Sequence, residues 1–405
     1  MVWFNGPIRA YKERRMPIVN RFHDLTNEIT EWRRDIHQNP EILYEVTRTA
    51  AKVADLLRTF GVDQVETGVG RTGVVGVIKG RGSSGQVIGL RADMDALPMS
   101  ENTGKPWASK VPGKMHACGH DGHTAMLLGA AKYLAETRNF DGTVVVIFQP
   151  AEEGGAGAQA MIDDGLITRY GIQRVFGMHN FPGMPVGTFG LRTGAMMASA
   201  DRLRITIEGI GGHAARPNMS RDPIVAGSAI VMAAQSIVSR SADPLEAAVV
   251  SLTVFNAGSA DNIIPQSALL RGTVRTLKPE VRDMVEARLN EIVTQVGAAY
   301  GVRAELEYRR DYPVTMNDPA EAVHVGDIAA RVVGEQNVDR NIVPTMGGED
   351  FSFMLNTVPG AFIFAGVGED VANLHNEAYD FNDELIPVGC SYWATLVETT
   401  MPRAA

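Results

Sequence analysis

The densest group of chemically active side chains lies at residues 115–123, with the sequence MHACGHDGH. Thiolate, imidazole and carboxylate groups together are ligands for zinc, and also for manganese, nickel or cobalt. Cys118 and His120 are separated by one glycine and could bind one ion or bridge two. The alternative is a polar turn that caps the next helix, which the cost of burying unpaired polar groups disfavours. Taken singly, His116 and His123 fit a capping or ligand-orienting role better.

A pair of adjacent carboxylates, Glu152 and Glu153, forms a second candidate group in the segment QPAEEGGAGA. Two such groups repel each other unless a cation or a shared proton separates their roles. The flanking glycines and the apolar run before them argue against a solvated acidic loop. We therefore expect one carboxylate to bind metal and the other to hold a water.

Apolar runs that precede several of these residues predict buried strands. They are GVVGVI at 73–78, VIGLR at 87–91, TVVVIF at 143–148 and RVFGM at 174–178. Helical patterns at 26–38, 48–60 and 123–138 alternate with them, which indicates an α/β sheet covered on both faces. Ligands of open α/β sheets bind beyond the carboxyl ends of the strands. Asp93, Asp95, Glu152, Glu153 and His179 should therefore meet at one edge.

The pattern changes near residue 201. Residues 202–208 alternate like a half-exposed strand, and a helix at 223–240, strands at 248–256 and 268–276, a helix at 279–300 and a strand at 302–309 follow. This β-α-β-β-α-β order predicts an inserted, ferredoxin-like α+β domain. The α/β pattern returns at 312 and ends in a helix at 384–400. We expect a larger α/β catalytic domain with a mixed sheet (1–199 and 311–405) and an inserted domain (200–310).

Length and composition agree with this division. A chain of 405 residues is too long for one ordinary core, and 45% hydrophobic with 21% charged residues is normal for a globular protein. A net charge of -9 argues against nucleic acid or anionic membrane as partners. Two cysteines exclude a disulfide framework, and a free thiol in a metal site favours a reducing, cytoplasmic location. We expect no membrane span and no signal peptide, and assign no function before Met16.

Eight segments then converge: RADMDALPM, MHACGHDGHTAMLLGAA, FQPAEEGGAGA, GMHN, GGHAARP, GTVRT, GGEDFS and LHNEAYDFND. Together they resemble the hippurate hydrolases, N-acyl-amino-acid aminoacylases and indole-acetyl-amino-acid hydrolases, within the carboxypeptidase G clan of metallopeptidases. The likeness runs in the family's order from Arg33 to the last helix. It implies an amidohydrolase that converts hippurate, N-acetyl or aryl-acetyl amino acids into a carboxylic acid and a free amino acid.

The resemblance implies a site with two divalent metal ions per subunit, zinc or manganese, with cobalt or nickel as alternatives. Cys118 would bridge the two ions. His120 and His179 would complete the ligands of one ion, and Glu153 and His375 those of the other. Arg91 stands where the wider clan often has a ligating histidine, a duty that His120 would take over.

Other residues are implied to act on the substrate. Glu152 would be the general base that takes a proton from a metal-activated water, and Asp93 would orient a ligating histidine. His213 would stabilise the oxyanion, and Arg275 with Asn262 would bind the substrate's carboxylate. In the family the inserted domain, which carries these three, also forms the dimer. A homodimer or a dimer of dimers is therefore expected.

Two other functions compete with this prediction. A dipeptidase or carboxypeptidase of the same clan would have much the same metal site, so only the choice of substrate separates it from an amidohydrolase. A non-catalytic metal-binding or ligand-binding homologue is the second rival. The intact Glu152 argues against that rival, because a pure binder needs no spare carboxylate beside the ligand Glu153.

Overall fold

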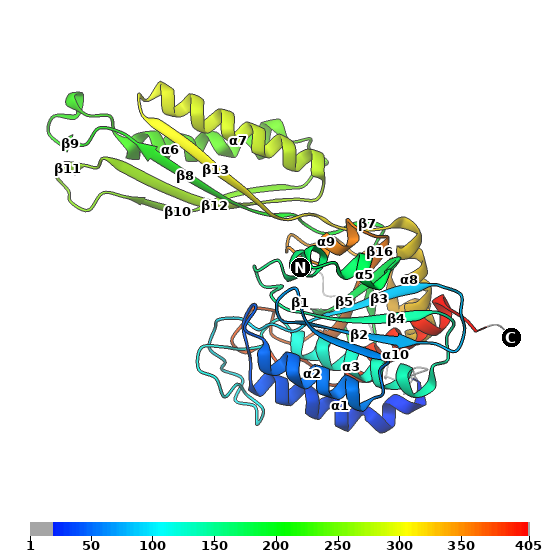
Figure 1. Ribbon diagram of the computed structural model, residues 1–405. Helices are drawn as coiled ribbons and strands as arrows, with labels where there is room; N and C mark the ends of the chain where they lie inside the picture. Colours follow the sequence, from blue (N-terminus) through cyan, green and yellow to red (C-terminus); the bar gives the residue numbers. More distant parts are fainter. Residues whose placement is uncertain (1–18, 404–405) are drawn as a thin grey trace, which may run out of the picture.

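The computed structural model describes residues 19–403, so the segment before Met16 lies outside the described residues. Its larger part is built on a mixed eight-stranded sheet with the order β1-β2-β4-β3-β5-β16-β6-β15 (Figure 1). The strands are β1 Gln64–Val69, β2 Gly73–Lys79, β3 Val87–Asp93, β4 Thr143–Gln149, β5 Arg174–Pro182, β6 Phe189–Gly190, β15 Val338–Asp339 and β16 Gly360–Gly368. Strands β4, β3, β5 and β16 pair in parallel, whereas β1 and β2 run antiparallel to their neighbours.

Helices cover both faces of this sheet, because its central strands are apolar on both sides. In β4, Val144, Val146 and Phe148 face one core, and Val145 and Ile147 face the other. The first core also includes residues of α1 Asn20–Gln38, α2 Thr47–Thr59, α3 His120–Thr137, α8 Pro319–Val333 and α10 Leu385–Thr400. The second includes residues of α4 Gly157–Asp163, α5 Leu166–Tyr170 and α9 Ser352–Leu355. The predicted mixed α/β fold is confirmed.

A second sheet forms a separate lobe that projects from the larger part (Figure 1). It has the antiparallel order β10-β12-β8-β13. Its strands and the two helices packed on one face of them are β8 Ala200–Glu208, α6 Pro223–Ser236, β10 Ala248–Ala257, β12 Ser267–Thr276, α7 Pro279–Ala299 and β13 Arg303–Tyr312. These are the elements in the order that the sequence predicted. The exact domain boundaries stay a prediction, and β13 crosses the one placed after residue 310.

Short elements complete the fold. Two small ladders pair β9 Gly212–His213 with β11 Ile263–Ile264, and β7 Gly194–Met197 with β14 Thr315–Asn317. Three short helical turns are η1 Pro217–Met219, η2 Ile237–Ser241 and η3 Glu335–Asn337.

One expectation about composition was wrong. We expected no apolar run of membrane-spanning length, but the helical stretch Pro223–Ser241 is long and apolar enough, with a mean hydropathy of 1.3. It is the only such helix among residues 19–403. Length and composition alone are weak evidence for a membrane span, and α6 within this stretch packs against α7 and the lobe's sheet. It follows that the apolar residues of α6 lie partly in the lobe's core and partly on its surface.

Candidate active site

The ends of three neighbouring strands and the start of α3 meet at one edge of the large sheet. Strand β3 ends at Asp93, β4 ends just before the Glu152–Glu153 pair, and β5 carries His179 near its end. Because these strands are parallel, their carboxyl ends lie together, as the sequence predicted. Helix α3 begins at His120 and brings the MHACGHDGH segment to the same edge.

Gly119 explains how this segment can approach β5 so closely. Its φ is 88°, a left-handed conformation that favours glycine. A Cβ atom at this position would lie 2.0 Å from Oδ1 of Asn180. Only glycine therefore allows Cys118 and His120, on either side of it, to sit against the end of β5.

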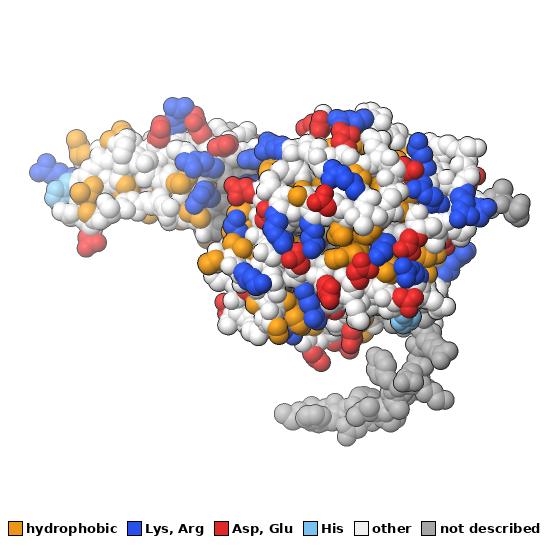
Figure 2. Space-filling model, turned by 60° about the horizontal axis from the view of Figure 1, so that its bottom comes forward, with side chains coloured by type: hydrophobic (Ala, Val, Ile, Leu, Met, Phe, Trp, Pro, Cys, Tyr) orange, Lys and Arg blue, Asp and Glu red, His pale blue; other side chains and the backbone are white. Residues whose placement is uncertain are grey.

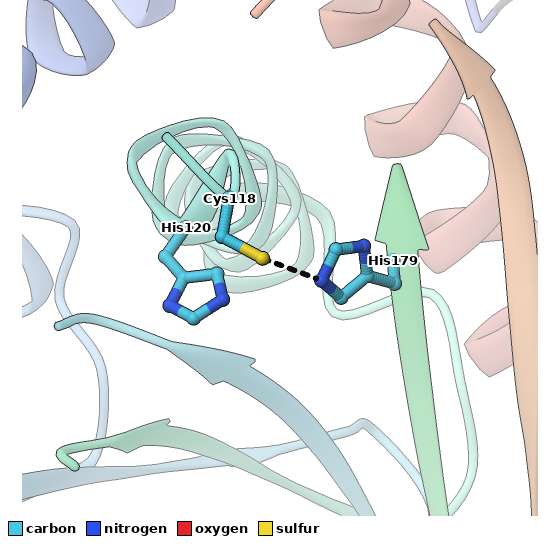
Figure 3. A group of neighbouring side chains, drawn as sticks. All are labelled: Cys118, His120 and His179. Atoms are coloured by element: carbon cyan, nitrogen blue, oxygen red, sulfur yellow. Dashed lines mark hydrogen bonds between the residues drawn. The ribbon is translucent and has the colours of Figure 1, made fainter. Parts of the chain in front are cut away.

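Cys118, His120 and His179 form a first group, with ligand atoms that all lie within 4.8 Å of one another (Figure 3). The sulfur of Cys118 is 3.5 Å from Nε2 of His179. Nδ1 of His120 is hydrogen-bonded to the carbonyl of Asp95 at 2.8 Å, and Nδ1 of His179 to that of Asn180 at 2.7 Å. Since carbonyls only accept, both rings carry their proton on Nδ1, which leaves both Nε2 atoms free to bind a metal.

Cys118, Glu153 and His375 form a second group within the same distance limit, so both groups share Cys118. Nε2 of His375 lies 3.2 Å from Oε1 of Glu153. His375 has a left-handed φ of 60°, and its N–H donates to the carbonyl of Ala117 at 2.8 Å. This bond fixes the loop of His375 against the loop of Cys118.

The chemistry of these donors fits two cations. Nε2 of His120 is a buried polar atom without a hydrogen-bond partner, and Oε1 of Glu153 is buried with His375 as its neighbour at 3.2 Å. Burial, with the charges of Glu153 and Glu152, raises the pKa of the Cys118 thiol well above its usual value. A divalent ion would reverse that effect, because a coordinating thiol is deprotonated outright. Sulfur, imidazole and carboxylate ligands suit zinc and related ions.

The loop that carries Glu152 and Glu153 is held in an unusual backbone conformation. Ala151 and Ala156 have left-handed φ values of 55° and 54°, which cost about 1 to 2 kcal/mol each for a residue with a Cβ. The carboxylate of Asp95 accepts hydrogen bonds from the N–H groups of Glu152 at 2.9 Å and Glu153 at 3.1 Å. The fold thus offsets this cost with specific contacts.

Glu152 lies beside Glu153 and His120 and is buried, with 7% of its surface exposed. Burial, with the charges of Glu349 and Glu153, raises the pKa of Glu152 well above its usual value. A carboxylate with a raised pKa takes up a proton more readily than an exposed one. Glu152 therefore has the surroundings of a general base.

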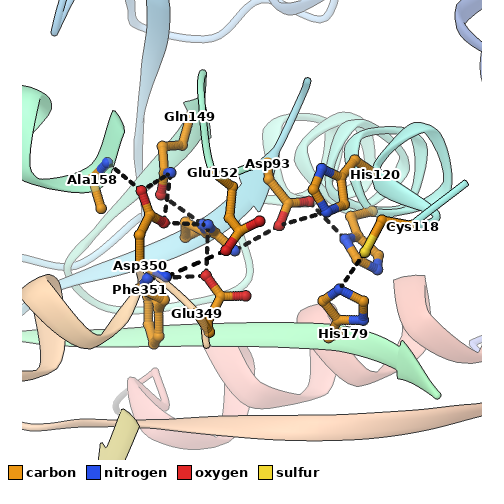
Figure 4. A network of polar contacts seen from close by, with 12 residues as sticks. Asp93, Cys118, His120, Gln149, Glu152, Ala158, His179, Glu349, Asp350 and Phe351 are labelled. Carbon is orange, nitrogen blue, oxygen red and sulfur yellow. Dashed lines mark hydrogen bonds and ion pairs between the residues drawn. The ribbon is translucent and has the colours of Figure 1, made fainter. Parts of the chain in front are cut away.

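A buried ionic network lies behind Glu152 (Figure 4). The guanidinium of Arg91 donates to Asp93 at 2.7 Å, to Glu349 at 2.9 Å and to Asp350 at 3.0 Å. Arg91 is thus a fixed cation among acids. No role was predicted for Glu349 and Asp350 from the sequence. The adjacent acidic residues in GGEDFS were the feature that could have pointed to them.

Asp93 lies closer to His123 than to His120. Its Oδ1 is 2.6 Å from Nδ1 of His123, and its Oδ2 is 3.6 Å from Nε2 of His120. The other nitrogen of His123 is 2.6 Å from Oδ1 of Asn180. Asp93 therefore holds His123 firmly between two side chains and approaches His120 only at longer range.

A cavity of about 670 Å³ opens above these groups, between the sheet edge and the lobe. Its lining includes Phe181, Met197, Phe364 and Leu374, which form an apolar wall, and Arg275 of β12. The rings of Phe181 and Phe364 are in contact, with centroids 4.5 Å apart and planes tilted by 32°. The cavity therefore offers an apolar surface and a cation within one space.

The three substrate residues predicted in the lobe occupy two different places. Arg275 lines the cavity, where it donates to the Thr273 hydroxyl and to the carbonyl of Val274, and it forms no ion pair with any residue of the described chain. His213 is exposed on β9, beside the turn that carries Asn262, at the far end of the lobe (Figure 1). His213 and Asn262 therefore do not line the cavity of their own chain.

Comparisons with known proteins agree with this architecture. Residues 89–399 match the family model of peptidase family M20/M25/M40. Hippurate hydrolase of Campylobacter jejuni is 44% identical over 94% of this chain and 98% of its own length. An N-acetylcysteine deacetylase of Bacillus subtilis is 41% identical over 90% and 94%. The crystal structure of a dinuclear metal-binding peptidase of Bacillus subtilis, with 36% identity, covers 94% of this chain and 99% of its own at a TM-score of 0.82.

Proposed function

The chain belongs to peptidase family M20/M25/M40 and is a hydrolase of amide bonds, and we propose that its substrates are N-acyl amino acids. Cleavage would release a carboxylic acid and a free amino acid, as for substrates of the hippurate, N-acetyl or aryl-acetyl type. One observation carries the proposal: two ligand groups share Cys118, with Glu152 beside them and a cavity that joins an apolar wall to Arg275.

Two divalent ions, zinc or manganese, would be held by Cys118, His120 and His179 on one side and by Cys118, Glu153 and His375 on the other. When bound, such ions polarise an amide carbonyl and lower the pKa of a water. The thiolate ligand favours a reducing compartment, which supports a cytoplasmic location.

Glu152 is the proposed general base. Its carboxylate takes a proton from the attacking water and returns it to the leaving nitrogen. The neighbouring Glu153 is bound to His375 and, in this scheme, to metal, so it is not free for proton transfer. The Arg91 network holds Glu349 close behind Glu152, which keeps the proton affinity of Glu152 high. Asp93 supports this arrangement by fixing His123 beside the ligand histidines.

The two ends of the substrate would bind to different walls of the cavity. Arg275 would bind the α-carboxylate through charge-assisted hydrogen bonds. It is available for this contact because it forms no ion pair within the described chain. The acyl group packs on the wall that includes Phe181 and Phe364, whose aromatic side chains suit a flat or apolar group. The amide bond would then lie between the apolar wall and Arg275, next to the proposed metal ligands.

We propose that His213 and Asn262 complete the site of a second copy of the chain. They lie at the end of the lobe, away from their own cavity, and apolar side chains are exposed near them. Figure 2 shows hydrophobic side chains exposed along the lobe, and Ile210, Met219 and Ile263 are 54%, 71% and 57% exposed. Val225 and Met232 on α6 and Val238 in η2 are also exposed. A closed two-fold dimer would cover such a surface.

The decisive experiment is a hydrolysis panel. N-acetyl, N-benzoyl and indole-acetyl amino acids would be offered to the purified enzyme with defined amounts of Zn²⁺, Mn²⁺ or Co²⁺, and the released amino acid would be measured. Dipeptides and C-terminally extended peptides belong in the same panel. Release from N-acyl amino acids alone supports the proposal, whereas preference for peptides would assign a dipeptidase or carboxypeptidase instead.

A further inference from the structure

The hydroxyl of Tyr312 occupies the centre of the loop that carries Glu152 and Glu153. It donates to the carbonyl of Glu152 at 2.6 Å and accepts from the N–H groups of Gly154 at 2.9 Å and Ala156 at 3.2 Å. A tyrosine hydroxyl has one proton to donate and two lone pairs to accept with. All of its hydrogen-bonding capacity is therefore used on one loop, and none remains for substrate or solvent.

This loop needs such a contact more than most loops do. Ala151, Gly154 and Ala156 have left-handed φ values of 55°, 93° and 54°, and two of these three residues carry a Cβ. Asp95 holds only the first part of the loop, through the N–H groups of Glu152 and Glu153. In the second part, Tyr312 binds the N–H groups of Gly154 and Ala156. Tyr44 contacts this part only through the carbonyl of Gly155, at 2.8 Å, and Asp350 accepts from the N–H of Ala158, where α4 has already begun.

Tyr312 is itself fixed from the other side. It is the last residue of β13, pairs with Ala200 at the start of β8, and is 7% exposed. Its ring packs edge-on against Phe353, with centroids 6.0 Å apart. The preceding Asp311 is paired with Arg202, which lies on β8. The hydroxyl thus stands where the chain leaves the lobe, on a framework that does not depend on the loop.

We propose that Tyr312 is a positioning residue for catalysis, which holds the Glu152–Glu153 loop in its productive conformation from the strand that joins the lobe to the larger part. The role rests on the proposed function of Glu152 and Glu153, since their carboxylates leave the loop on either side of the carbonyl that Tyr312 binds. Loss of the hydroxyl would free the N–H of Ala156 and would leave the Glu152 carbonyl and the Gly154 N–H with only their mutual contact of 2.6 Å, so the left-handed residues would relax. Both carboxylates would then sample positions away from the metal ligands.

The test compares Tyr312→Phe with Tyr308→Phe in the full-length, metal-loaded enzyme. Tyr308 is the matched control, because it lies on the same strand and its hydroxyl bonds to Asp201 rather than to the loop, at 2.6 Å. Hydrogen–deuterium exchange of a peptide covering residues 150–158 should become at least about tenfold faster in Tyr312→Phe and stay unchanged in Tyr308→Phe. Steady-state kinetics on an N-acyl amino acid should show kcat lowered about 10- to 100-fold and KM altered less than about threefold.

The two readouts separate the proposal from the function on which it rests. Unchanged exchange in Tyr312→Phe would overturn the positioning role whatever the substrate. Faster exchange with an unchanged kcat would confine the hydroxyl to a structural role and equally overturn it. If the wild-type enzyme cleaves no N-acyl amino acid, the proposed function fails, while the exchange result still decides whether the hydroxyl holds the loop.

A second variant covers the case in which Tyr312→Phe does not fold. Adding Ala156→Gly removes the penalty of a left-handed residue with a Cβ, so Tyr312→Phe/Ala156→Gly should fold more readily. The double variant should still exchange faster than Ala156→Gly alone and should have a lower kcat than that single variant. Equal exchange and equal kcat in these two proteins would overturn the proposal.

Discussion

The sulfur of Cys118 lies 3.5 Å from Nε2 of His179, although the two residues are 61 positions apart in the chain. The contact exists because α3 begins against the end of β5 at a glycine that tolerates no Cβ. No covalent bond joins the two side chains, and both atoms are good metal ligands. Their separation leaves room for an ion bound by both atoms.

Removal of metal should abolish hydrolysis. Dialysis against a chelator, checked by elemental analysis, should leave less than about 1% of the activity, and Zn²⁺, Mn²⁺ or Co²⁺ should restore it. The ion that restores the highest kcat at stoichiometric amounts identifies the preferred metal. Full activity in a protein verified as metal-free would refute the assignment of the ligand groups.

Cys118→Ala should lower metal occupancy, whereas Cys390→Ala should not. Cys118 is common to both ligand groups, so its loss affects both ions. Cys390 is also buried, but it lies in α10 and its thiol donates to the carbonyl of Met126 at 3.3 Å. Metal content would be measured by mass spectrometry on both variants after the same gel filtration. Similar metal loss in the two variants would contradict the distinction.

Glu152→Gln should lower kcat by about 10²- to 10⁴-fold, the usual contribution of general acid–base catalysis. Glutamine keeps the shape of the side chain but cannot accept the proton. Metal content should stay near that of the wild type, because Glu153 rather than Glu152 belongs to the group with Cys118 and His375. Wild-type turnover by Glu152→Gln, or a parallel loss of metal, would count against the general-base role.

Arg275→Gln should lower kcat/KM about 10- to 100-fold for substrates with a free α-carboxylate, as expected for a lost hydrogen bond to a charged group. Substrates with an amidated carboxylate should be cleaved poorly by the wild type and equally poorly by the variant. Arg271→Gln is the control, because Arg271 is exposed on the same strand and does not line the cavity. If the variant still discriminates against the amide, the anchor lies elsewhere.

The positions of the strand-end residues were predictable from the sequence for a simple reason. Strands buried on both faces read as continuous apolar runs, so the ends of β3, β4 and β5 could be recognised, with Asp93, Glu152 and His179 at or near them. The sharing of Cys118 was not derivable from spacing, because one glycine allows either one ion or a bridge. That expectation came from the resemblance alone.

Contacts between distant segments could not be predicted. Arg91 and Glu349 are 258 positions apart, and Tyr312 is 160 positions from Glu152. No periodicity marks such partners, since each is set by the tertiary packing of strands that meet only in the folded chain. His375 is a similar case, because it lies in an irregular segment with a left-handed φ and precedes no regular element.

Stability should depend on the protonation of His37, which lies 2.8 Å from Asp121 and 3.3 Å from Glu101. Burial disfavours the charged ring, but these carboxylates raise the pKa of His37 to about 9. The folded-state pKa thus lies above the unfolded value of about 6.5. The stabilisation is therefore complete below pH 6.5 and is lost as the pH rises through 9, by about 3 kcal/mol in all.

Urea unfolding of the wild type and of His37→Gln at pH 6.5 and pH 9.5 checks this expectation. The difference in unfolding free energy between the two proteins should shrink by about 3 kcal/mol from the lower to the higher pH, since glutamine does not titrate. Metal loading must be the same in both proteins at each pH. A constant difference would mean that His37 stays neutral in the folded protein.

The last prediction is that His213 acts on the site of a second subunit. In its own chain, His213 is exposed on β9 at the end of the lobe, and its Nδ1 accepts only from the N–H of Ala215 at 3.1 Å. It does not line the cavity that contains Cys118 and Glu152. A histidine needed at the metals must therefore come from another copy, or its own lobe must swing a long way.

A mixing experiment distinguishes these two cases. One chain carries Glu152→Gln and the other His213→Ala, each nearly inactive alone, and both are co-expressed with different tags. With sharing between subunits, a mixed dimer has one site with both defects and one site with neither. Random assembly makes half of the dimers mixed, so the pool should recover roughly a quarter of wild-type activity, and purified mixed dimers roughly half. Two differently tagged Glu152→Gln chains serve as the control and should recover nothing. Mixed dimers as inactive as their parents would place the action of His213 within its own chain.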